Sequence, residues 1–266
     1  MVDGQVRGTE IVIERGSWSL RGIERGEGAP TVVFIHGWTC DHTTLSPQID
    51  RMSMNHRCIA LDIRGHGKSE SPDNESWEIE DLAGDVVDAV DSLGLDPVVL
   101  VGHSMGGTIA YEAAARLGPR VHGLALLHPM PLRHTPESQA LFDAVAGQLG
   151  SDESHTSTRE AIVDGAMFTD ETSPELRRHL RDLMLATRSD AATGCWGGLA
   201  HYDSAHQPMS DLNAVVVSGV RAANDDALIK TLLPLARIEH LSTGSFVQLE
   251  AAATVTDLVS QLVAAS

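Results

Sequence analysis

The sequence predicts an α/β fold: a mainly parallel sheet of eight strands, with helices on both faces and an inserted helical cap. Short apolar runs rich in β-branched residues recur along the chain, and amphipathic helical stretches separate most of them. The central runs are continuously apolar, which is typical of parallel strands covered on both faces. Regular alternation of strand and helix favours a doubly wound sheet.

Eight runs are expected to form the strands, and Gly16 joins the first two. In chain order they are Ile11–Ile13, Trp18–Ile23, Thr31–Ile35, Cys58–Ile63, Pro97–Val101, Val121–Leu127, Ala214–Ser218 and Ala236–Leu241. Helical spacing is found in three further stretches: Glu75–Leu93, Ser104–Leu117 and Phe246–Val263.

One long interval, 130–208, contains no strand-like run and reads as polar and helical sequence. A structureless loop of that length is uncommon inside a compact domain, so the interval predicts an inserted cap, or lid. The expected domains are therefore a core of residues 1–129 and 209–266, and a cap of residues 130–208. We expect the cap to cover a largely apolar pocket.

Length and composition narrow the functional classes. A chain of 266 residues suits one large α/β domain with an insertion. The net charge of −18 argues against nucleic acid, which needs clustered Lys and Arg. No apolar stretch reaches the ~18–20 residues of a membrane helix, and Met1–Gln5 lacks the pattern of a signal peptide.

Three cysteines, Cys40, Cys58 and Cys195, have no paired spacing and fit buried thiols in a reducing compartment. We therefore expect a cytoplasmic protein that acts on a small molecule, with no membrane or nucleic-acid partner. The sequence predicts no cofactor and no metal site, and it leaves the oligomeric state open.

The strongest motif is the pentapeptide from Gly102 to Gly106, which reads Gly-His-Ser-Met-Gly. A predicted buried strand precedes it and a predicted helix follows, which is the setting that makes G-x-S-x-G a nucleophile elbow. Such a turn exposes Ser104 Oγ at the carboxyl edge of the sheet, where sites form in α/β folds. The Met105 N–H, at the start of the helix, should then point toward a developing oxyanion.

A second motif, His36-Gly37-Trp38, directly follows the strand Thr31–Ile35. Its position predicts that the Trp38 N–H is the second oxyanion donor and that the Trp38 indole walls the substrate pocket. We expect His36 to be a structural hydrogen-bonding residue rather than a base.

With a third segment, Asp62-Ile63-Arg64-Gly65-His66-Gly67-Lys68-Ser69, these motifs closely resemble the α/β-hydrolase superfamily in order and spacing. The resemblance is to the branch that contains small esterases, lactonases and cofactor-free haloperoxidases. It is strong from Thr31 to Pro129 and weaker over the last fifty residues. It implies a Ser-His-Asp triad, and a mainly structural role for Asp62 and Arg64.

The acid of that triad is not at its usual place. In the family it follows a strand as Gly-x-x-Asp, whereas here Gly219 is followed by Ala222 at the position of the acid. Asp225 and Asp226 lie just beyond. Asp225 is the candidate substitute, and either residue reads equally well as an acid at a helix start.

The histidine is also missing. The family places it after the last strand as Gly-His, where this chain has Gly244-Ser245, so Ser245 occupies its position beside the substrate. His240 and His128, near the ends of two predicted strands, are candidate replacement bases. The remaining histidines, from His42 to His206, are expected at the surface or in the cap.

Three functions remain open. The first is an enzyme that hydrolyses an activated ester or lactone through Ser104, with an unusual base or none. The second is a non-hydrolytic catalyst of cyclisation, elimination or decarboxylation that uses the same pocket and oxyanion hole. The third is a ligand-binding protein that has lost catalysis. Efficient Ser-His-Asp hydrolysis is not expected, because a serine hydroxyl is a poor nucleophile without a base.

Overall fold

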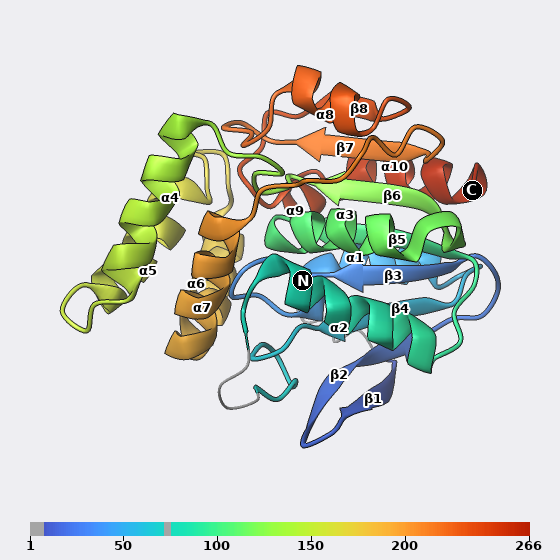
Figure 1. The fold of residues 1–266 in the computed structure, drawn as a ribbon, viewed down its shortest axis with the longest axis horizontal. Coiled ribbons are helices and arrows are strands. Elements are labelled where there is room, and N and C mark those ends of the chain that lie inside the picture. Colours follow the sequence, from blue (N-terminus) through green and yellow to red (C-terminus); the bar gives the residue numbers. More distant parts are fainter. Residues whose placement is uncertain (1–7, 72–75) are drawn as a thin grey trace.

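The computed structural model describes residues 8–71 and 76–266, and it contains the expected eight-stranded sheet (Figure 1). The strand order is β1-β2-β4-β3-β5-β6-β7-β8. β1 pairs antiparallel with β2, β2 pairs antiparallel with β4, and all other neighbours are parallel. The strands are β1 (Thr9–Arg15), β2 (Trp18–Arg25), β3 (Thr31–Ile35), β4 (Cys58–Asp62), β5 (Val98–His103), β6 (Val121–Leu127), β7 (Ala214–Ser218) and β8 (Arg237–His240).

Helices cover both faces of the sheet, as the continuously apolar strands predict. Side chains alternate along β3: Val32 and Phe34 pack in one apolar cluster, Val33 and Ile35 in the other. The first cluster lies under α1 (Ser46–Met52) and α10 (Ala252–Ala264), with α9 (Val247–Glu250) beside them; the second lies under α2 (Ile79–Ser92) and α3 (Met105–Leu117). The remaining core elements are α8 (Asp226–Leu232) and two short 3₁₀ helices, η1 (His42–Leu45) and η2 (Gly118–Arg120).

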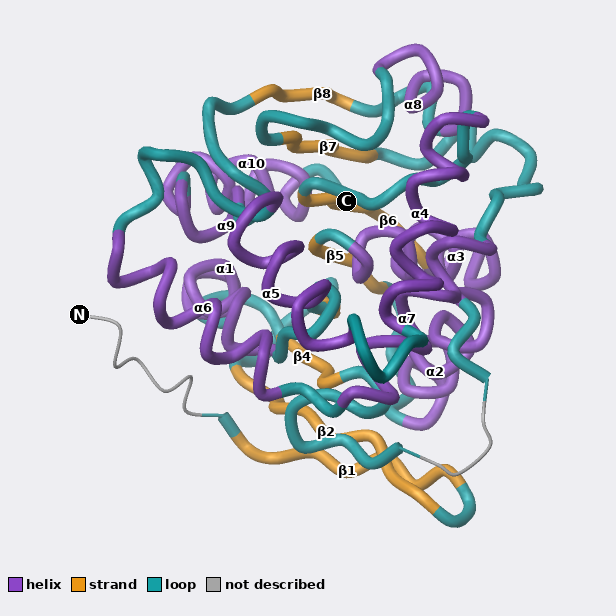
Figure 2. Tube along the Cα trace, turned by 90° about the vertical axis from the view of Figure 1, so that its left-hand side faces the viewer, coloured by secondary structure: helices purple, strands orange, loops and turns teal. Residues whose placement is uncertain are grey.

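Four helices fill the interval between β6 and β7: α4 (Pro136–Leu149), α5 (His155–Ala166), α6 (Pro174–Ala186) and α7 (Ser189–His201). They lie beyond the carboxyl ends of the parallel strands, at the left of Figure 1 and facing the viewer in Figure 2. Thr135 and Ser173 cap α4 and α6 through their side chains, and each helix has proline in its first turn. The interval 130–208 is therefore helical and sits at the edge of the sheet where Ser104 lies.

The last helix differs from its prediction. The stretch Phe246–Val263 reads as one helix, but the structure breaks it at Ala251 into α9 and α10. The Gln48 side chain explains the break, because its amide N–H₂ donates to the Gln248 carbonyl at 3.0 Å and to Thr256 Oγ1 at 3.1 Å. A side chain inserted into the helical hydrogen-bond ladder is a known cause of such breaks.

Other expectations can be compared with the described residues. The three cysteines are free and buried, as expected. Residues 8–71 and 76–266 include no helix that is both long and apolar enough to cross a membrane. Glu75, the expected start of the helix Glu75–Leu93, and Met1–Gln5 lie outside the described residues. The corresponding helix, α2, begins at Ile79.

Candidate active site

Ser104 occupies the turn between β5 and α3 with φ 53° and ψ −120°, a backbone conformation that is strained for any residue but glycine. Its N–H donates to the Leu127 carbonyl at 2.9 Å, and its own carbonyl accepts from the Met130 N–H at 3.3 Å. The turn is thus tied to the neighbouring strand β6 and to the segment that follows it. The side chain is 8% exposed.

Two glycines of the motif are required by close packing. A Cβ on Gly102 would lie 2.1 Å from the Gly106 carbonyl oxygen, and a Cβ on Gly106 would lie 2.3 Å from the carbonyl oxygens of Ile35 and His36. Because these neighbours are backbone atoms, they have little freedom to move aside. The end of β3 therefore packs directly against the turn that carries Ser104.

The two expected oxyanion donors come from the ends of neighbouring elements. Met105 is the first residue of α3, where backbone N–H groups lack helical acceptors and the helix dipole favours negative charge. Trp38 follows β3, the strand beside β5. Within residues 8–71 and 76–266, neither N–H donates to another backbone or side-chain acceptor. Both N–H groups are therefore without an acceptor in the described part of the chain.

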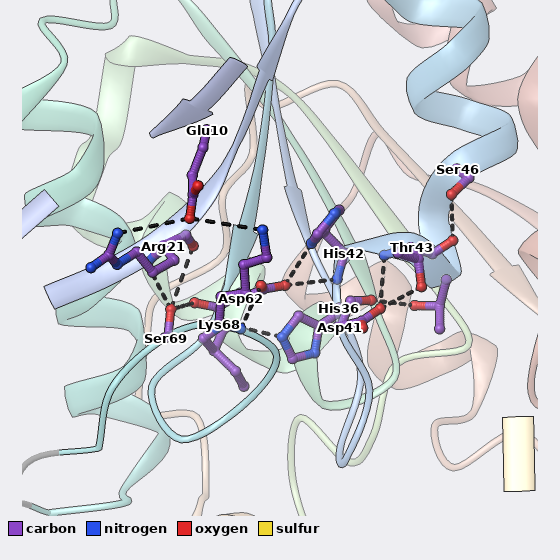
Figure 3. A network of polar contacts seen from close by, with 12 residues as sticks. Glu10, Arg21, His36, Asp41, His42, Thr43, Ser46, Asp62, Lys68 and Ser69 are labelled. Atoms are coloured by element: carbon purple, nitrogen blue, oxygen red, sulfur yellow. Dashed lines mark hydrogen bonds and ion pairs between the residues drawn. The ribbon is translucent and has the colours of Figure 1, made fainter. Parts of the chain in front are cut away.

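A polar network holds the loop that carries Trp38 (Figure 3). His36 Nδ1–H donates to the Gly37 carbonyl at 2.8 Å, and His36 Nε2 accepts from the Ile63 N–H at 3.0 Å. Asp62 accepts from the backbone N–H groups of His42 and Lys68. Both ring nitrogens of His36 are used, which matches the structural role that its position suggests.

His66 anchors the same loop from the other side. Its Nε2 accepts from the Thr39 N–H at 3.1 Å, and its Nδ1–H donates to the Arg64 carbonyl at 2.9 Å. Burial lowers the pKa of His66 to about 3, so the ring is neutral. The expectation that the remaining histidines lie at the surface or in the cap is wrong for His66 and for His103, each 2% exposed in the core.

Ser245 lies in the loop between β8 and α9, against the turn that carries Ser104. Its N–H donates to the Met167 carbonyl of the cap interval at 2.9 Å, and its carbonyl oxygen lies 2.9 Å from His103 Nε2. Glu250 supports the loop, because its Oε2 accepts from the Gly244 N–H at 3.2 Å and from Thr172 Oγ1 at 2.8 Å.

The contact with Ser245 fixes the tautomer of His103. A carbonyl oxygen only accepts hydrogen bonds, so Nε2 carries the hydrogen and Nδ1 keeps a lone pair. His103 Nδ1 is buried and has no hydrogen-bond partner among the described residues. Burial lowers the pKa of His103 to about 3, so the ring remains neutral.

His128 has the same tautomer as His103, with the hydrogen on Nε2. Its Nδ1 accepts from the Gly219 N–H at 3.1 Å, so Nε2 carries the hydrogen and is a donor. The residue follows β6, has a φ of 50°, and its N–H donates to the Val217 carbonyl at 2.6 Å. Burial lowers the pKa of His128 to about 4. In this state His128 can offer a hydrogen bond to a substrate, but Nε2 cannot accept a proton.

The other two sequence candidates are exposed and have partners of their own. His240 ends β8, three strands from β5 and therefore about 14 Å across the sheet at ~4.8 Å per strand. Its exposed imidazole lies 3.0 Å from the Asp226 carboxylate. Asp225 caps α8 by accepting from the Leu228 N–H at 2.7 Å. Ala222, at the family's acid position, is exposed.

The cap interval contacts the site at two places. The Trp38 indole N–H donates to the Ala192 carbonyl at 2.8 Å, and the Trp38 ring packs edge-on against Trp196. At the Ser245 loop, Phe168 stacks near Phe246. A cavity of about 270 Å³ lies between the segments 171–176 and 242–250, beside that loop. No cluster of potential metal ligands was found in the described part of the chain.

A mainly parallel sheet in which a strained serine joins a central strand to the next helix is the class of fold in which G-x-S-x-G forms a nucleophile elbow. A family model described as alpha/beta hydrolase fold matches residues 30–197, and the chain belongs to that family. The expected superfamily is therefore confirmed.

Curated relatives match only part of their own length. A 2-(acetamidomethylene)succinate hydrolase of Mesorhizobium japonicum is 32% identical over 129 residues, which are 48% of this chain and 46% of that protein. Protein phosphatase methylesterase 1 of Mus musculus is 35% identical over 126 residues, 44% of this chain and 32% of that protein. The chain thus spans less than half of the length of these relatives.

Solved structures match over nearly the whole chain. An esterase from Exiguobacterium antarcticum superimposes with a TM-score of 0.83 at 21% identity, covering 94% of this chain and 98% of that one. The enol-lactonase from Burkholderia xenovorans LB400 gives a TM-score of 0.79 at 24% identity, covering 96% and 100%. Likeness at this level of identity shows the shared fold.

Proposed function

We propose that this chain hydrolyses a small, activated carboxylic ester or lactone, with Ser104 as the nucleophile. The observation that carries the proposal is the geometry of Ser104, strained between β5 and α3 and accompanied by the free N–H groups of Trp38 and Met105. Hydrolases among the relatives and structural neighbours, including an esterase and an enol-lactonase, support this class of reaction.

In the proposed reaction, Ser104 Oγ attacks the carbonyl carbon while the carbonyl oxygen takes the negative charge. The N–H groups of Trp38 and Met105 donate to that oxygen, and one such donor is worth about 10²–10³ in turnover. The residues 130–208 act as a lid that excludes water, and the indole of Trp38 forms part of the pocket wall.

The missing histidine limits the rate. In serine hydrolases the triad acts as a unit, and losing the histidine alone costs ~10⁶ in turnover, while ~10³–10⁴ remains from the oxyanion hole and binding. An activated substrate, whose leaving group needs little protonation, is the kind that such a site can still turn over.

A fluorophosphonate probe tests this function, because it bonds covalently to a nucleophilic serine and its adduct can be located by mass spectrometry. The unmodified protein should label slowly at Ser104, and Ser104→Ala should not label. Hydrolysis of a p-nitrophenyl ester measures catalysis directly, and the unmodified protein should hydrolyse it faster than Ser104→Ala does. An unmodified protein that labels no faster than Ser104→Ala overturns the proposal.

A non-hydrolytic reaction is the second candidate, and the tautomer of His128 favours it. An Nε2–H donor beside an oxyanion hole can stabilise an enolate or carboxylate without an acyl-serine. Cyclisation, elimination or decarboxylation would then survive Ser104→Ala, whereas hydrolysis through Ser104 would not. A binding protein without catalysis would show neither reaction.

A further inference from the structure

The loop that carries the Trp38 N–H continues into Thr39, whose φ of 55° lies in the left-handed region that favours glycine. Thr39 is fully buried. Its N–H donates to His66 Nε2 at 3.1 Å, and its Oγ1 donates to the Trp38 carbonyl at 2.8 Å. A residue in such a strained conformation is retained only where its surroundings hold it in place.

The carbonyl of Thr39 is held by the cap interval and not by the core. Thr187 Oγ1 donates to it at 3.0 Å, between residues 148 positions apart. In the described part of the chain, no other group donates to this carbonyl. Thr187 therefore satisfies a buried acceptor on the residue next to the proposed oxyanion donor.

Thr187 is itself fixed within the cap interval. Its backbone is extended, with φ −63° and ψ 143°, between the end of α6 and the start of α7. Its carbonyl accepts from Arg159 Nη2 of α5 at 3.0 Å, and the same nitrogen donates to the Met184 carbonyl of α6 at 2.7 Å. The position of the Thr187 hydroxyl thus depends on the packing of α5, α6 and α7.

A second bond joins the same loop to the cap interval. The Trp38 indole N–H donates to the Ala192 carbonyl, near the start of α7. This part of α7 packs closely on the core, since a Cβ built on Gly65 would lie 2.8 Å from Ala191 Cβ. The cap interval therefore holds both Trp38 and Thr39.

We propose that Thr187 is a positioning residue for the oxyanion hole, because its hydroxyl holds the Thr39 carbonyl and thereby sets the direction of the Trp38 N–H. This inference rests on the proposed hydrolysis through Ser104. A change of backbone torsion angles that moves the Thr39 carbonyl also displaces the Trp38 N–H. The oxyanion hole is then complete only while the cap is closed, so that the substrate carbonyl is polarised in a site from which water is excluded.

The expected effect is on the chemical step and not on substrate binding. An oxyanion donor acts in the transition state, so a misdirected donor lowers kcat and leaves KM unchanged. KM reports binding here, because a slow chemical step lets the substrate dissociate many times per turnover. Losing a donor outright costs about 10²–10³ in turnover, so displacing one should cost about 10-fold.

The test measures kcat and KM for a p-nitrophenyl ester in variants of Thr187. Thr187→Val keeps the shape of the side chain but lacks the hydroxyl, and its kcat should fall about 10-fold at unchanged KM. Thr187→Ala also lacks the hydroxyl and is smaller, so it should show the same fall even if the valine packs poorly. Thr187→Ser keeps the hydroxyl and should restore most of the lost turnover.

Thr193→Val is the matched control. The Thr193 hydroxyl also donates to a backbone carbonyl, that of Leu149 at 3.2 Å, but this bond lies within the cap interval. Its loss should leave both kcat and KM unchanged. Circular dichroism of each variant checks that the fold is retained.

The outcomes separate this inference from the proposed function. If Thr187→Val and Thr187→Ala keep the kcat of the unmodified protein while Ser104→Ala is inactive, the positioning role is overturned and the proposed function stands. A rise in KM alone, or a Thr187→Ser variant as slow as Thr187→Val, also overturns the positioning role, because binding or packing then accounts for the loss. An unmodified protein no faster than Ser104→Ala overturns the proposed function and this inference together.

Discussion

The Ser245 carbonyl oxygen accepts a hydrogen bond from His103 Nε2–H at 2.9 Å, between residues 142 positions apart. Ser245 also donates its N–H to the Met167 carbonyl. The loop that carries the catalytic histidine in this family is thus held here by backbone atoms, which a change of side chain leaves in place. The position of residue 245 beside the nucleophile turn therefore does not depend on the side chain of residue 245.

Gly37→Ala should damage the site without unfolding the protein. The new Cβ would lie 2.8 Å from His103 Nδ1 and 3.2 Å from Ser104 Cβ, so the loop with the Trp38 N–H must shift. We expect labelling of Ser104 to fall by about 10²-fold, the effect of losing one oxyanion donor. Gly84→Ala, in α2, is the control. The added Cβ would contact only the guanidinium end of Arg116, at 3.7 Å, so this variant should label normally. If Gly37→Ala and Gly84→Ala label at the same rate, the loop after β3 does not supply an oxyanion donor.

His240→Ala should leave labelling unchanged. The imidazole is exposed and pairs with Asp226, on a strand three positions from β5. Its loss should also change the free energy of unfolding by no more than about 0.5 kcal/mol, as for most surface substitutions. A fall in the labelling rate of His240→Ala would show instead that this ring reaches Ser104 through a rearrangement of β8.

Acid should destabilise the fold through its buried histidines. The folded-state pKa values of His66 and His103, about 3, and of His128, about 4, lie below the unfolded value of 6.5. The unfolded chain therefore binds more protons below pH 6.5, and stability that is complete above that pH is lost as pH falls toward 4. Each ring contributes a slope of at most about 1.4 kcal/mol per pH unit.

The pKa of His42 is shifted the other way: burial lowers it, but the hydrogen bond to Asp62 and the negative charges of Asp62 and Asp41 together raise it above its usual value. Four histidines with lowered pKa values, His36 included, against one with a raised value leave a net loss of stability in acid. Urea unfolding at pH 7, 6 and 5 measures it, and His103→Gln should reduce the slope by the share of one histidine. A free energy of unfolding that stays constant from pH 7 to 5 would contradict the buried neutral rings.

Local patterns in the sequence were sufficient to predict the sheet and the turn that carries Ser104. The runs that form β3, β5 and β6 are apolar throughout, and the glycines around Ser104 make its turn recognisable. What the sequence could not reveal depends on distant partners. The break at Ala251 comes from Gln48, 200 positions before Gln248, and the tautomer of His103 comes from Ser245.

Ser245→His should speed the labelling of Ser104. The substitution places an imidazole where the family has one, on a loop already fixed by His103, Met167 and Glu250. A positioned base is worth about 10²–10⁴-fold, and we expect the lower end because no carboxylate orients the new ring. Ala222, at the family's acid position, is exposed, and Asp225 is occupied in capping α8.

The double variant Ser245→His with Ala222→Asp should therefore label faster than Ser245→His alone, and Ala222→Asp alone should label at the unmodified rate. The labelling rate of Ser245→His should also fall below about pH 6.5, as an accessible imidazole becomes protonated; the unmodified protein, which has no imidazole at this position, should not show this step. This difference in pH profile identifies the imidazole at position 245 as the base. If Ser245→His folds normally and its Ser104 labels no faster than in the unmodified protein, the site is shaped for chemistry without an acyl-serine. Elimination, cyclisation or decarboxylation would then be the favoured reaction.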